Sequence, residues 1–444
     1  MKKRYLSLLL AGVCVAGALS GCGAKTEAPA TEEVKAEAED TAAEDDADAP
    51  EESVEEALDV STGEDTMAAS DTHSDFVRVT DYVFEVTFDN YEQYFEDSRA
   101  FMSEKYKIGA CSSVQNDMIR GRNYDWYYDD SVCFVAHVPA TEDRHASVGV
   151  VTGAGLTAEQ VLSGEEHDIY KILPYGTLDG INDEGLCINI NVVNFGEKGE
   201  FVMRTEDTSD DVAPLAVPRL LLDKAGNIEE AVAMLKEMDI YSLGKGNEAH
   251  YMLSGKTSAT DDTYKCVVIE LIPDENKHYQ ISVVDKFVGD MPIMTNFHLT
   301  GYDGTMESLT EHPMGLERYE ILVKNYGMSD TIPGMQDLMK KVYFTRNYDL
   351  YSDNWWYSDM AKSANLTMAD RGAACLNGDP ANAGAYEAQI RTEMADYLNR
   401  SRSDKDKSWH TVHTSVFDCE KNELYMTSQE GAIVYHFGLD SRID

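Results

Sequence analysis

Positive charge is scarce in this sequence. The chain of 444 residues has 37 lysine and arginine residues against 81 aspartate and glutamate residues, which leaves a net charge of −44. Proteins that bind nucleic acid or anionic lipid through charge do so with basic patches. The acidic balance therefore argues against both kinds of partner, and we expect no nucleic acid to bind.

Long apolar runs are absent beyond the N-terminal segment, so no later stretch is expected to span a bilayer. That segment has basic Lys2-Lys3-Arg4 followed by apolar Tyr5–Leu19, the pattern of a signal peptide. It ends in Leu19-Ser20-Gly21-Cys22, which resembles the bacterial lipobox. Residues 1–22 are therefore expected to be a lipoprotein signal peptide ending in the lipobox cysteine. Lipid on Cys22 would anchor an extracytoplasmic protein to the cell membrane, and an ordinary secretory cleavage site is the alternative.

Aromatic residues are nearly absent from residues 23–75, which consist mainly of Ala, Glu, Asp and Thr. Acidic runs such as Glu44-Asp45-Asp46 repel one another and bury no apolar surface. We expect a disordered acidic stalk that holds the folded body away from the membrane. An acidic tail that binds a partner is the alternative.

The sequence also lacks the common metal and phosphate motifs. It has no CxxC pair and no Cys/His cluster with zinc-like spacing, so we expect no metal and no cofactor. Gly255-Lys256-Thr257 lacks the leading glycine of a phosphate loop. His410 and His413 are three apart on a predicted strand and would point to opposite faces. Disulfide pairing stays open for the six cysteines of the body: Cys111, Cys133, Cys187, Cys266, Cys375 and Cys419.

The stretch around Cys111 reads as a tight hairpin. Small and β-branched residues run from Ile108 to Gln115, a polar turn follows, and a second strand brings Arg122 and Asp125 back toward Cys111. A thiol beside a guanidinium should have a depressed pKa, and the carboxylate can orient a base. The alternative is a buried structural cysteine with a surface ion pair.

Alternation of polar and apolar residues predicts the rest of the body. We expect strands around 82–88, 132–138, 146–151, 186–191, 249–253, 266–272, 279–284, 410–417, 423–427 and 431–437, and helices around 91–102, 214–223, 227–238 and 315–324. Asn189 and Asn191 share one face of their strand, and a row of carboxamides suits an oxyanion hole. A solvated strand edge is the alternative. Asn296 lies in a loop and is a second candidate amide donor.

Five motifs in order resemble the choloylglycine hydrolase family of N-terminal-nucleophile hydrolases, which includes conjugated bile-acid hydrolases and penicillin V acylases, with acid ceramidases as relatives. The motifs are Cys-Ser-Ser followed by Gly-Arg-Asn-Tyr-Asp, then Asp-Gly-Ile-Asn-Asp-Glu-Gly-Leu, Met-Thr-Asn, Leu-Glu-Arg-Tyr and His-Thr-Ser-Val-Phe-Asp. Each motif is weak alone, but five in order are a strong signal. The resemblance covers residues 111–444 and implies an α+β fold, the four-layer αββα sandwich of mostly antiparallel sheets.

The resemblance also implies a role for each site residue. Cys111 is the nucleophile and its own α-amine, which titrates near pH ~8, is the base. Arg122 polarises the thiolate, Asp125 orients the amine, Asn296 is the catalytic amide, Arg318 organises the charged centre, and Asn191 serves the oxyanion with Asn194 as the fallback. Tyr124 and Trp126 beside the site suggest a pocket for an apolar acyl group, with core packing as the alternative.

The activity that the resemblance implies is hydrolysis of a linear, non-peptide carbon–nitrogen amide bond through a thioester. The partner would be a small-molecule linear amide with an apolar acyl group, and a homo-oligomer is compatible with this activity. Because a long segment precedes Cys111, the acid-ceramidase-like arrangement is favoured, with residues 76–110 as a pro-segment cut by self-cleavage at Ala110–Cys111. The alternatives are a two-lobed solute-binding lipoprotein with a βαβ rhythm and no catalysis, and an acyltransferase on the same fold.

Overall fold

The computed structural model describes residues 66–67, 70–98, 110–126, 132–153, 155–165, 167–193, 211–240, 249–273, 279–305, 308, 315–342, 410–428 and 433–443. The predicted signal segment with Cys22, most of the predicted stalk, and Asn194 lie outside the described residues. Within the described part, no helix has both the length and the apolar character that a membrane span requires.

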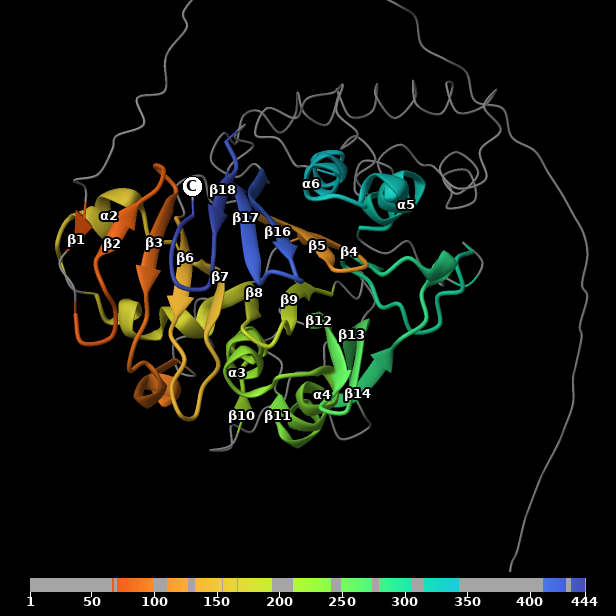
Figure 1. Ribbon diagram of the computed structural model, residues 1–444, viewed down its shortest axis with the longest axis horizontal. Helices are drawn as coiled ribbons and strands as arrows, with labels where there is room; N and C mark the ends of the chain where they lie inside the picture. Colours follow the sequence, from red (N-terminus) through yellow and green to blue (C-terminus); the bar gives the residue numbers. More distant parts are fainter. Residues whose placement is uncertain are drawn as a thin grey trace, which may run out of the picture. The chain divides into compact units, whose positions relative to one another are not determined.

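Two large sheets make up the body (Figure 1). The ten-stranded sheet contains, in spatial order, β1 (Thr66–Met67), β2 (Phe76–Arg78), β3 (Val83–Thr87), β6 (Cys133–Val138), β7 (Ser147–Thr152), β8 (Thr177–Asn182), β9 (Cys187–Val192), β12 (Ala249–Ser258), β13 (Asp261–Pro273) and β14 (Tyr279–Val284). The six-stranded sheet contains β15 (Ile293–Met294), β4 (Ala110–Asn116), β5 (Ile119–Trp126), β16 (His410–Asp418), β17 (Glu423–Ser428) and β18 (Tyr435–Phe437). A short parallel pair, β10 (Asp211–Val212) and β11 (Asp239–Ile240), completes the described strands.

Nearly every pairing in the two large sheets is antiparallel, and the described exception is β3 with β6. Antiparallel sheets bury one face and need no crossover helix between neighbouring strands. The prediction of mostly antiparallel sheets is confirmed. The βαβ rhythm that a two-lobed binding protein requires is not the pattern of the described residues.

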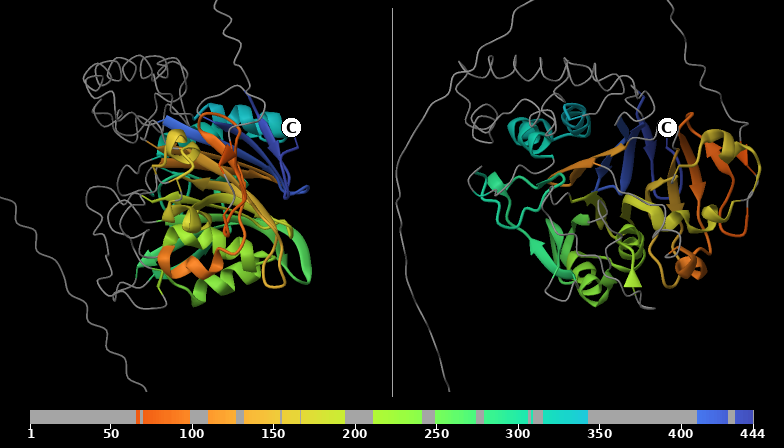
Figure 2. Two further views of the ribbon diagram at one scale, coloured as in Figure 1. Left: turned by 90° about the vertical axis from the view of Figure 1, so that its left-hand side faces the viewer. Right: turned by 180° about the vertical axis from the view of Figure 1, so that it is seen from behind.

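Helices cover the outer face of each sheet. The α-helices with described bounds are α2 (Ala158–Leu162), α3 (Val217–Lys224), α4 (Ile228–Glu237), α5 (Leu316–Asn325) and α6 (Ile332–Lys340), and residues 95–98 are also helical. There are 3₁₀ turns at Glu92–Tyr94, Asp168–Gly176, Pro214–Ala216, Val288–Asp290 and Tyr326–Met328. α3 packs on β8 and α4 on β12, while α5 packs on β4 and β15 and α6 on β5 and β16. Both views of Figure 2 show the pair α3 and α4 on one side of the sheets and the pair α5 and α6 on the other. The predicted αββα layering is therefore observed.

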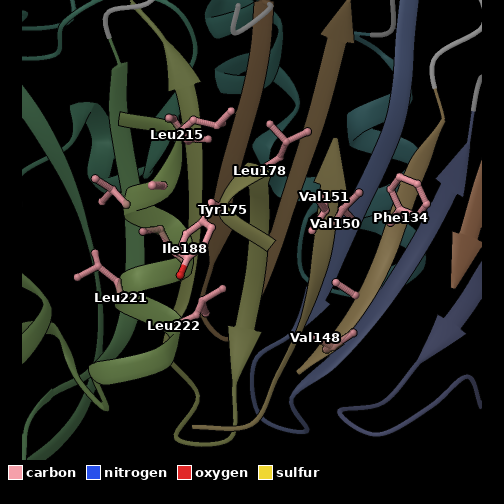
Figure 3. Close-up of a cluster of buried hydrophobic side chains, with 14 of the residues drawn as sticks. Phe134, Val148, Val150, Val151, Tyr175, Leu178, Ile188, Leu215, Leu221 and Leu222 are labelled. Atoms are coloured by element: carbon pink, nitrogen blue, oxygen red, sulfur yellow. The ribbon is translucent and has the colours of Figure 1, made fainter. Parts of the chain in front are cut away.

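The space between the ten-stranded sheet and α3 is filled by aliphatic and aromatic side chains. Figure 3 shows part of this cluster, with Leu221 and Leu222 on α3 and Ile188 on β9. A second cluster lies under α5 and α6 and includes Met335 and Met339. The α4 helix begins as predicted, because the Asn227 side chain accepts a hydrogen bond from the backbone of Glu230.

The folded body begins earlier than composition predicts. β1 falls within the predicted stalk, and Thr72 and His73 are buried, with the His73 ring stacked 4.4 Å from the ring of Phe76. The end of the stalk at residue 75 is thus placed too late. β2 and β3, in the predicted pro-segment, are strands of the ten-stranded sheet, and the described part of the predicted helix 91–102 begins with the turn Glu92–Tyr94.

Candidate active site

The hairpin of β4 and β5 places Cys111 in the interior, between the two large sheets. Cys111 pairs with Tyr124 and Ala110 pairs with Asp125 across the hairpin, and the Cys111 side chain is completely buried. The turn contains Asp117 with a φ of 49°, a conformation that aspartate adopts more readily than most residues. The predicted hairpin is confirmed.

Arg122 lies between Cys111 and the ten-stranded sheet. Its Nη2 donates to Cys111 Sγ at 3.3 Å and to the Ile190 carbonyl at 3.0 Å. Its Nη1 donates to Asp179 Oδ2 at 2.7 Å. The contact between guanidinium and thiol is as predicted, but the predicted depression of the thiol pKa is wrong. Burial raises the pKa of Cys111, because desolvation of the thiolate outweighs the nearby Arg122 cation.

The partner of Arg122 is a buried carboxylate that the sequence reading did not assign to the site. Asp179 on β8 accepts a hydrogen bond from Ser415 Oγ at 2.9 Å through Oδ1, and its Oδ2 lies 3.1 Å from His413 Nε2. Burial alone would raise the pKa of Asp179, but Arg122 and then His413 outweigh it, so the pKa is lowered. Asp179 is the first residue of the Asp-Gly-Ile-Asn motif, a pattern that by itself predicts only a turn and a strand.

The sequence indicates no role for His413, because its spacing from His410 on a strand excludes a shared metal site. The structure buries it completely between the sheets, with its ring 5.4 Å from the Tyr124 ring and its Nδ1 3.6 Å from Cys133 Sγ. Burial lowers the pKa of His413 from 6.5, so its imidazole is neutral at pH 7. Its Nε2 atom lies 3.2 Å from Arg122 Nη1, so His413 is one of the side chains packed around that guanidinium.

The backbone of Cys111 is held as closely as its thiol. Its α-nitrogen donates to Asn296 Oδ1 at 3.2 Å, and Asn296 Nδ2 donates to the Val192 carbonyl at 2.7 Å. From α5, Arg318 Nη1 donates to the Cys111 carbonyl at 2.5 Å, and Nη2 donates to Asn296 Oδ1. The thiol, the nitrogen and the carbonyl of this one residue are thus each held by a different buried side chain: Arg122, Asn296 and Arg318.

A glycine allows α5 to approach the site. Gly315 is the N-cap of α5 with a φ of +86°, where L-residues are strained. A Cβ atom at this position would lie 3.0 Å from Arg318 Nη2 and 3.0 Å from Thr295. The backbone conformation and the lack of space for a Cβ atom therefore both require glycine at this position. With glycine here, the Arg318 side chain can lie against the loop that carries Asn296.

Asp125 is completely buried at the end of β5. Its Oδ1 accepts a hydrogen bond from Thr411 Oγ1 at 2.7 Å, and its Oδ2 lies 3.5 Å from Arg318 Nη1. Burial raises the pKa of Asp125 to about 7, against the opposing effect of Arg318. This carboxyl can therefore gain or lose a proton near neutral pH, and its contact with a free α-amine stays a prediction.

Asn191 is buried, so the alternative of a solvated strand edge is wrong. Its Nδ2 donates to the backbone carbonyls of Met294 and Thr295 at 3.2 and 3.1 Å, and its Oδ1 accepts from Ser113 Oγ at 3.2 Å. These contacts hold the loop that leads into Asn296. Both amide hydrogens are directed at backbone carbonyls, so the structure supports a positioning role for Asn191 in place of the predicted oxyanion contact.

Of the two side chains predicted to line an acyl pocket, the structure describes that of Tyr124. Tyr124 is 4% exposed and lies under the Arg122 guanidinium, whose Cζ is 5.1 Å from the ring centroid. This is the core-packing alternative, and a contact of Tyr124 with substrate stays a prediction. The side chain of Trp126 lies outside the described residues. None of the five cysteines that the structure describes forms a disulfide.

Comparison with known protein families gives a match to the part of the chain that contains Arg122, Asp125, Asp179 and Asn191. A family model described as acyl-coenzyme A:6-aminopenicillanic acid acyl-transferase matches residues 114–253, which is less than half of the chain. No curated protein sequence matches the chain. The match supports the predicted resemblance to the choloylglycine hydrolase group and an amidase or acyltransferase of the N-terminal-nucleophile type.

Solved structures with low similarity to this chain include a conjugated bile acid hydrolase and a penicillin V acylase. A mutant form of the conjugated bile acid hydrolase from Clostridium perfringens has a TM-score of 0.34 and 17% identity, covering 75% of this chain and 94% of that one. Penicillin V acylase from Agrobacterium tumefaciens has a TM-score of 0.34 and 15% identity, covering 74% of this chain and 86% of that one.

Proposed function

We propose that this chain is a membrane-anchored amidase that hydrolyses a linear, non-peptide carbon–nitrogen amide bond with Cys111 as its N-terminal nucleophile. The observation that carries the proposal is the arrangement around this one residue, whose thiol, nitrogen and carbonyl are each bonded to a buried side chain. Burying charged groups costs free energy unless they are paired. A cysteine that served only for packing would not need two buried guanidinium groups beside it.

The proposal requires a cut between Ala110 and Cys111, because an α-nitrogen in an amide bond cannot act as a base. In this step Cys111 Sγ attacks the Ala110 carbonyl carbon, and the thiol proton passes to the departing nitrogen as the C–N bond breaks. Water then hydrolyses the thioester and leaves a carboxyl group on Ala110 and a free amine on Cys111. Asn296, which already accepts a hydrogen bond from this nitrogen, would hold the new amine beside the thiol.

Turnover would follow the same chemistry on a substrate amide. The α-amine titrates near pH ~8, so it can take the thiol proton at neutral pH. The thiolate attacks the substrate carbonyl, the amine returns the proton to the leaving nitrogen, and water hydrolyses the thioester. The raised pKa of the Cys111 thiol makes this proton transfer necessary, because little thiolate is present beforehand.

The enzyme would act outside the cytoplasm, held by lipid on Cys22 and separated from the membrane by the acidic stalk. The substrate would be a small linear amide with an apolar acyl group, since Cys111 belongs to a cluster of buried hydrophobic side chains. Bile-acid conjugates, penicillin V, N-acyl amino acids and N-acyl ethanolamines all fit this description. The net charge of −44 disfavours nucleic acid as a partner, and the enzyme would act as a monomer or a homo-oligomer.

The first test is the intact mass of the full chain beside that of a Cys111→Ala variant. We expect a break before residue 111 in the parent and an uncut variant. The cut parent should then release an amine from at least one of the four substrate classes. An uncut parent that hydrolyses none of them would contradict the proposal.

A second candidate function is acyl transfer, which is favoured by the acyl-transferase description of the matched family. Here an amine takes the place of water in opening the thioester. Supplying competing amines with a substrate distinguishes the two activities. A product that carries the acyl group on the added amine, at the expense of free acid, would favour transfer.

A further inference from the structure

Two buried groups compete for the charge of Arg122. Asp179 Oδ2 lies 2.7 Å from Nη1, and Cys111 Sγ lies 3.3 Å from Nη2. The side chains of Arg122 and Asp179 have no solvent-exposed area. A cation that is already paired with a carboxylate does less to stabilise a neighbouring thiolate, because the two charges largely cancel at the sulfur.

The groups that face this guanidinium come from five strands. They are Cys111 on β4, Tyr124 on β5, Cys133 on β6, Asp179 on β8 and His413 on β16. Burial raises the pKa of Cys111, raises that of Cys133 to about 12, and raises that of Tyr124 well above 10, while it lowers that of His413. Asp179 is thus the one member of this set that is charged at neutral pH. Asp125 and Arg318, which contact each other at 3.5 Å, also act on the Cys111 thiol: Asp125 raises its pKa and Arg318 lowers it.

Asp179 is itself held in place by neutral donors. Ser415 donates to Oδ1, and His413 Nε2 lies 3.1 Å from Oδ2. In the tautomer with a proton on Nε2, His413 donates to this carboxylate and its Nδ1 can accept from the Cys133 thiol at 3.6 Å. Arg122 Nη1 also lies 3.2 Å from Nε2. With these contacts and Arg122 in place, the carboxylate has no freedom to turn away from the guanidinium.

We propose that Asp179 is a positioning residue that neutralises Arg122 and keeps the Cys111 sulfur as a protonated thiol until the α-amine removes its proton. The inference rests on the proposed role of Cys111 as the nucleophile. It reverses the usual expectation that an arginine beside a cysteine produces thiolate. It also assigns a purpose to the pair of His413 and Ser415, which is to fix the orientation of the carboxylate.

The test is an ultraviolet titration of the Cys111 thiolate in the full chain, obtained by subtracting the spectrum of a matched Cys111→Ala variant. We expect the parent midpoint to lie at or above the ordinary thiol value of about 8.5. In Asp179→Asn, which keeps the shape and removes the charge, the midpoint should fall by about one pH unit or more, a tenfold gain in the ratio of thiolate to thiol. Self-cleavage should nevertheless slow, because Arg122 loses its anchor.

Ser415→Ala and His413→Gln are the matched controls, because each alters a neutral contact of Asp179 and keeps its charge. Because Arg122 and the second neutral donor still hold the carboxylate in each of these variants, their midpoints should fall less than that of Asp179→Asn, and the midpoint of Asp179→Glu should stay close to that of the parent. An unchanged or higher midpoint in Asp179→Asn would overturn the inference. If Asp179→Asn does not fold, the titration of the parent protein alone tests the proposal. A midpoint for the parent Cys111 thiol below about pH 7 contradicts it, since ordinary thiols titrate near 8.5.

Intact mass shows whether each sample is cut or uncut, and the midpoints of parent and variants are compared only within one of these states, because a free α-amine would itself shift the thiol titration. The Cys111→Ala spectrum serves only as the blank for the other absorbing groups. The titration can be read in a chain that neither cuts itself nor hydrolyses any amide. Failure of the proposed function is therefore distinguishable from failure of this inference.

Discussion

The hydroxyl oxygen of Tyr91 lies 2.8 and 2.7 Å from the two carboxylate oxygens of Asp223, and the two residues stand on opposite sides of the proposed cut before Cys111. Burial raises the pKa of Tyr91 well above 10, so its hydroxyl keeps the proton and acts as the donor. Arg219 Nη2 pairs with the same carboxylate at 2.7 Å. The segment before the cut is thus bonded to α3, in addition to the pairing of β3 with β6.

We therefore predict that the two pieces stay together after self-cleavage, so that the catalytic part remains on its lipid anchor. Size-exclusion chromatography of the cut protein should show one species under native conditions, and a denaturing gel should show two. Tyr91→Phe leaves the buried carboxylate without this donor and should lower the free energy of unfolding by about 1–3 kcal/mol, measured with urea. Tyr94→Phe, at a half-buried tyrosine of the same segment, is the control. Recovery of the catalytic piece alone from a native column would contradict the prediction.

Asn191 separates two explanations of the amide-bearing strand. If Asn191 is an oxyanion donor, its loss should slow amide hydrolysis on the order of 10²–10³-fold and leave the stability of the fold unchanged. If Asn191 instead holds the loop through the Met294 and Thr295 carbonyls, its loss should lower the thermal unfolding midpoint and also slow self-cleavage. We predict the second result for Asn191→Leu, measured by calorimetry and by the time course of intact mass. A slow variant with the parent's thermal midpoint would restore the oxyanion assignment.

The parts of the site that the sequence predicted are those with a local signal. The hairpin of Cys111, Arg122 and Asp125 follows from strand alternation and a polar turn, and the Met-Thr-Asn and Leu-Glu-Arg-Tyr motifs led to Asn296 and Arg318. Each of these residues was identified within a short window of sequence. The structure then placed all five around one buried centre.

What the sequence could not supply was the relation between the sheets. Asp179 becomes the partner of Arg122 only because β8 faces β5 across the interior, and no pattern within either strand indicates that contact. The raised pKa of Cys111 depends on complete burial, which outweighs the neighbouring arginine that the sequence did reveal. The stalk boundary was misplaced because β1 to β3 are short and take their place from pairing with β6, which composition does not report.

Gly315 offers a test of how closely α5 must approach the site. Gly315→Ala would place a methyl group 3.0 Å from Arg318 Nη2 at a φ of +86°. We predict a loss of roughly 1–2 kcal/mol in unfolding free energy from backbone strain alone, and slower self-cleavage because Arg318 is displaced. Gly327→Ala is the control, since its Cβ would meet nothing within 4 Å. If both variants cut themselves at the parent rate, the position of Arg318 does not depend on this glycine.

The pH dependence of stability should report a buried histidine behind the Asn296 loop. His250 is completely buried, its Nε2 lies 3.0 Å from the Thr295 carbonyl, and burial lowers its pKa to about 4. At this residue the folded protein therefore binds fewer protons than the unfolded chain between the pKa values of 4 and 6.5, so the stability that depends on His250 is full above pH 6.5 and falls as the pH drops toward 4. Asp125, whose pKa burial raises to about 7, acts in the opposite direction, in the parent and in a His250 variant alike. The loss should be on the order of 3 kcal/mol for His250.

Urea unfolding of the parent and of His250→Gln, repeated over this pH range, checks the prediction. The variant keeps a donor for Thr295 but cannot take up the proton, so its stability should fall less steeply. The slope should be reduced and not abolished, because burial also lowers the pKa of His73 to about 4 and lowers that of His413. The pKa of Glu270 is lowered to about 2 by His298, although burial opposes it, so its contribution is lost only below pH 4.5 and meets this window only at its acidic end. Parallel curves for parent and variant would show that His250 is not the group that titrates.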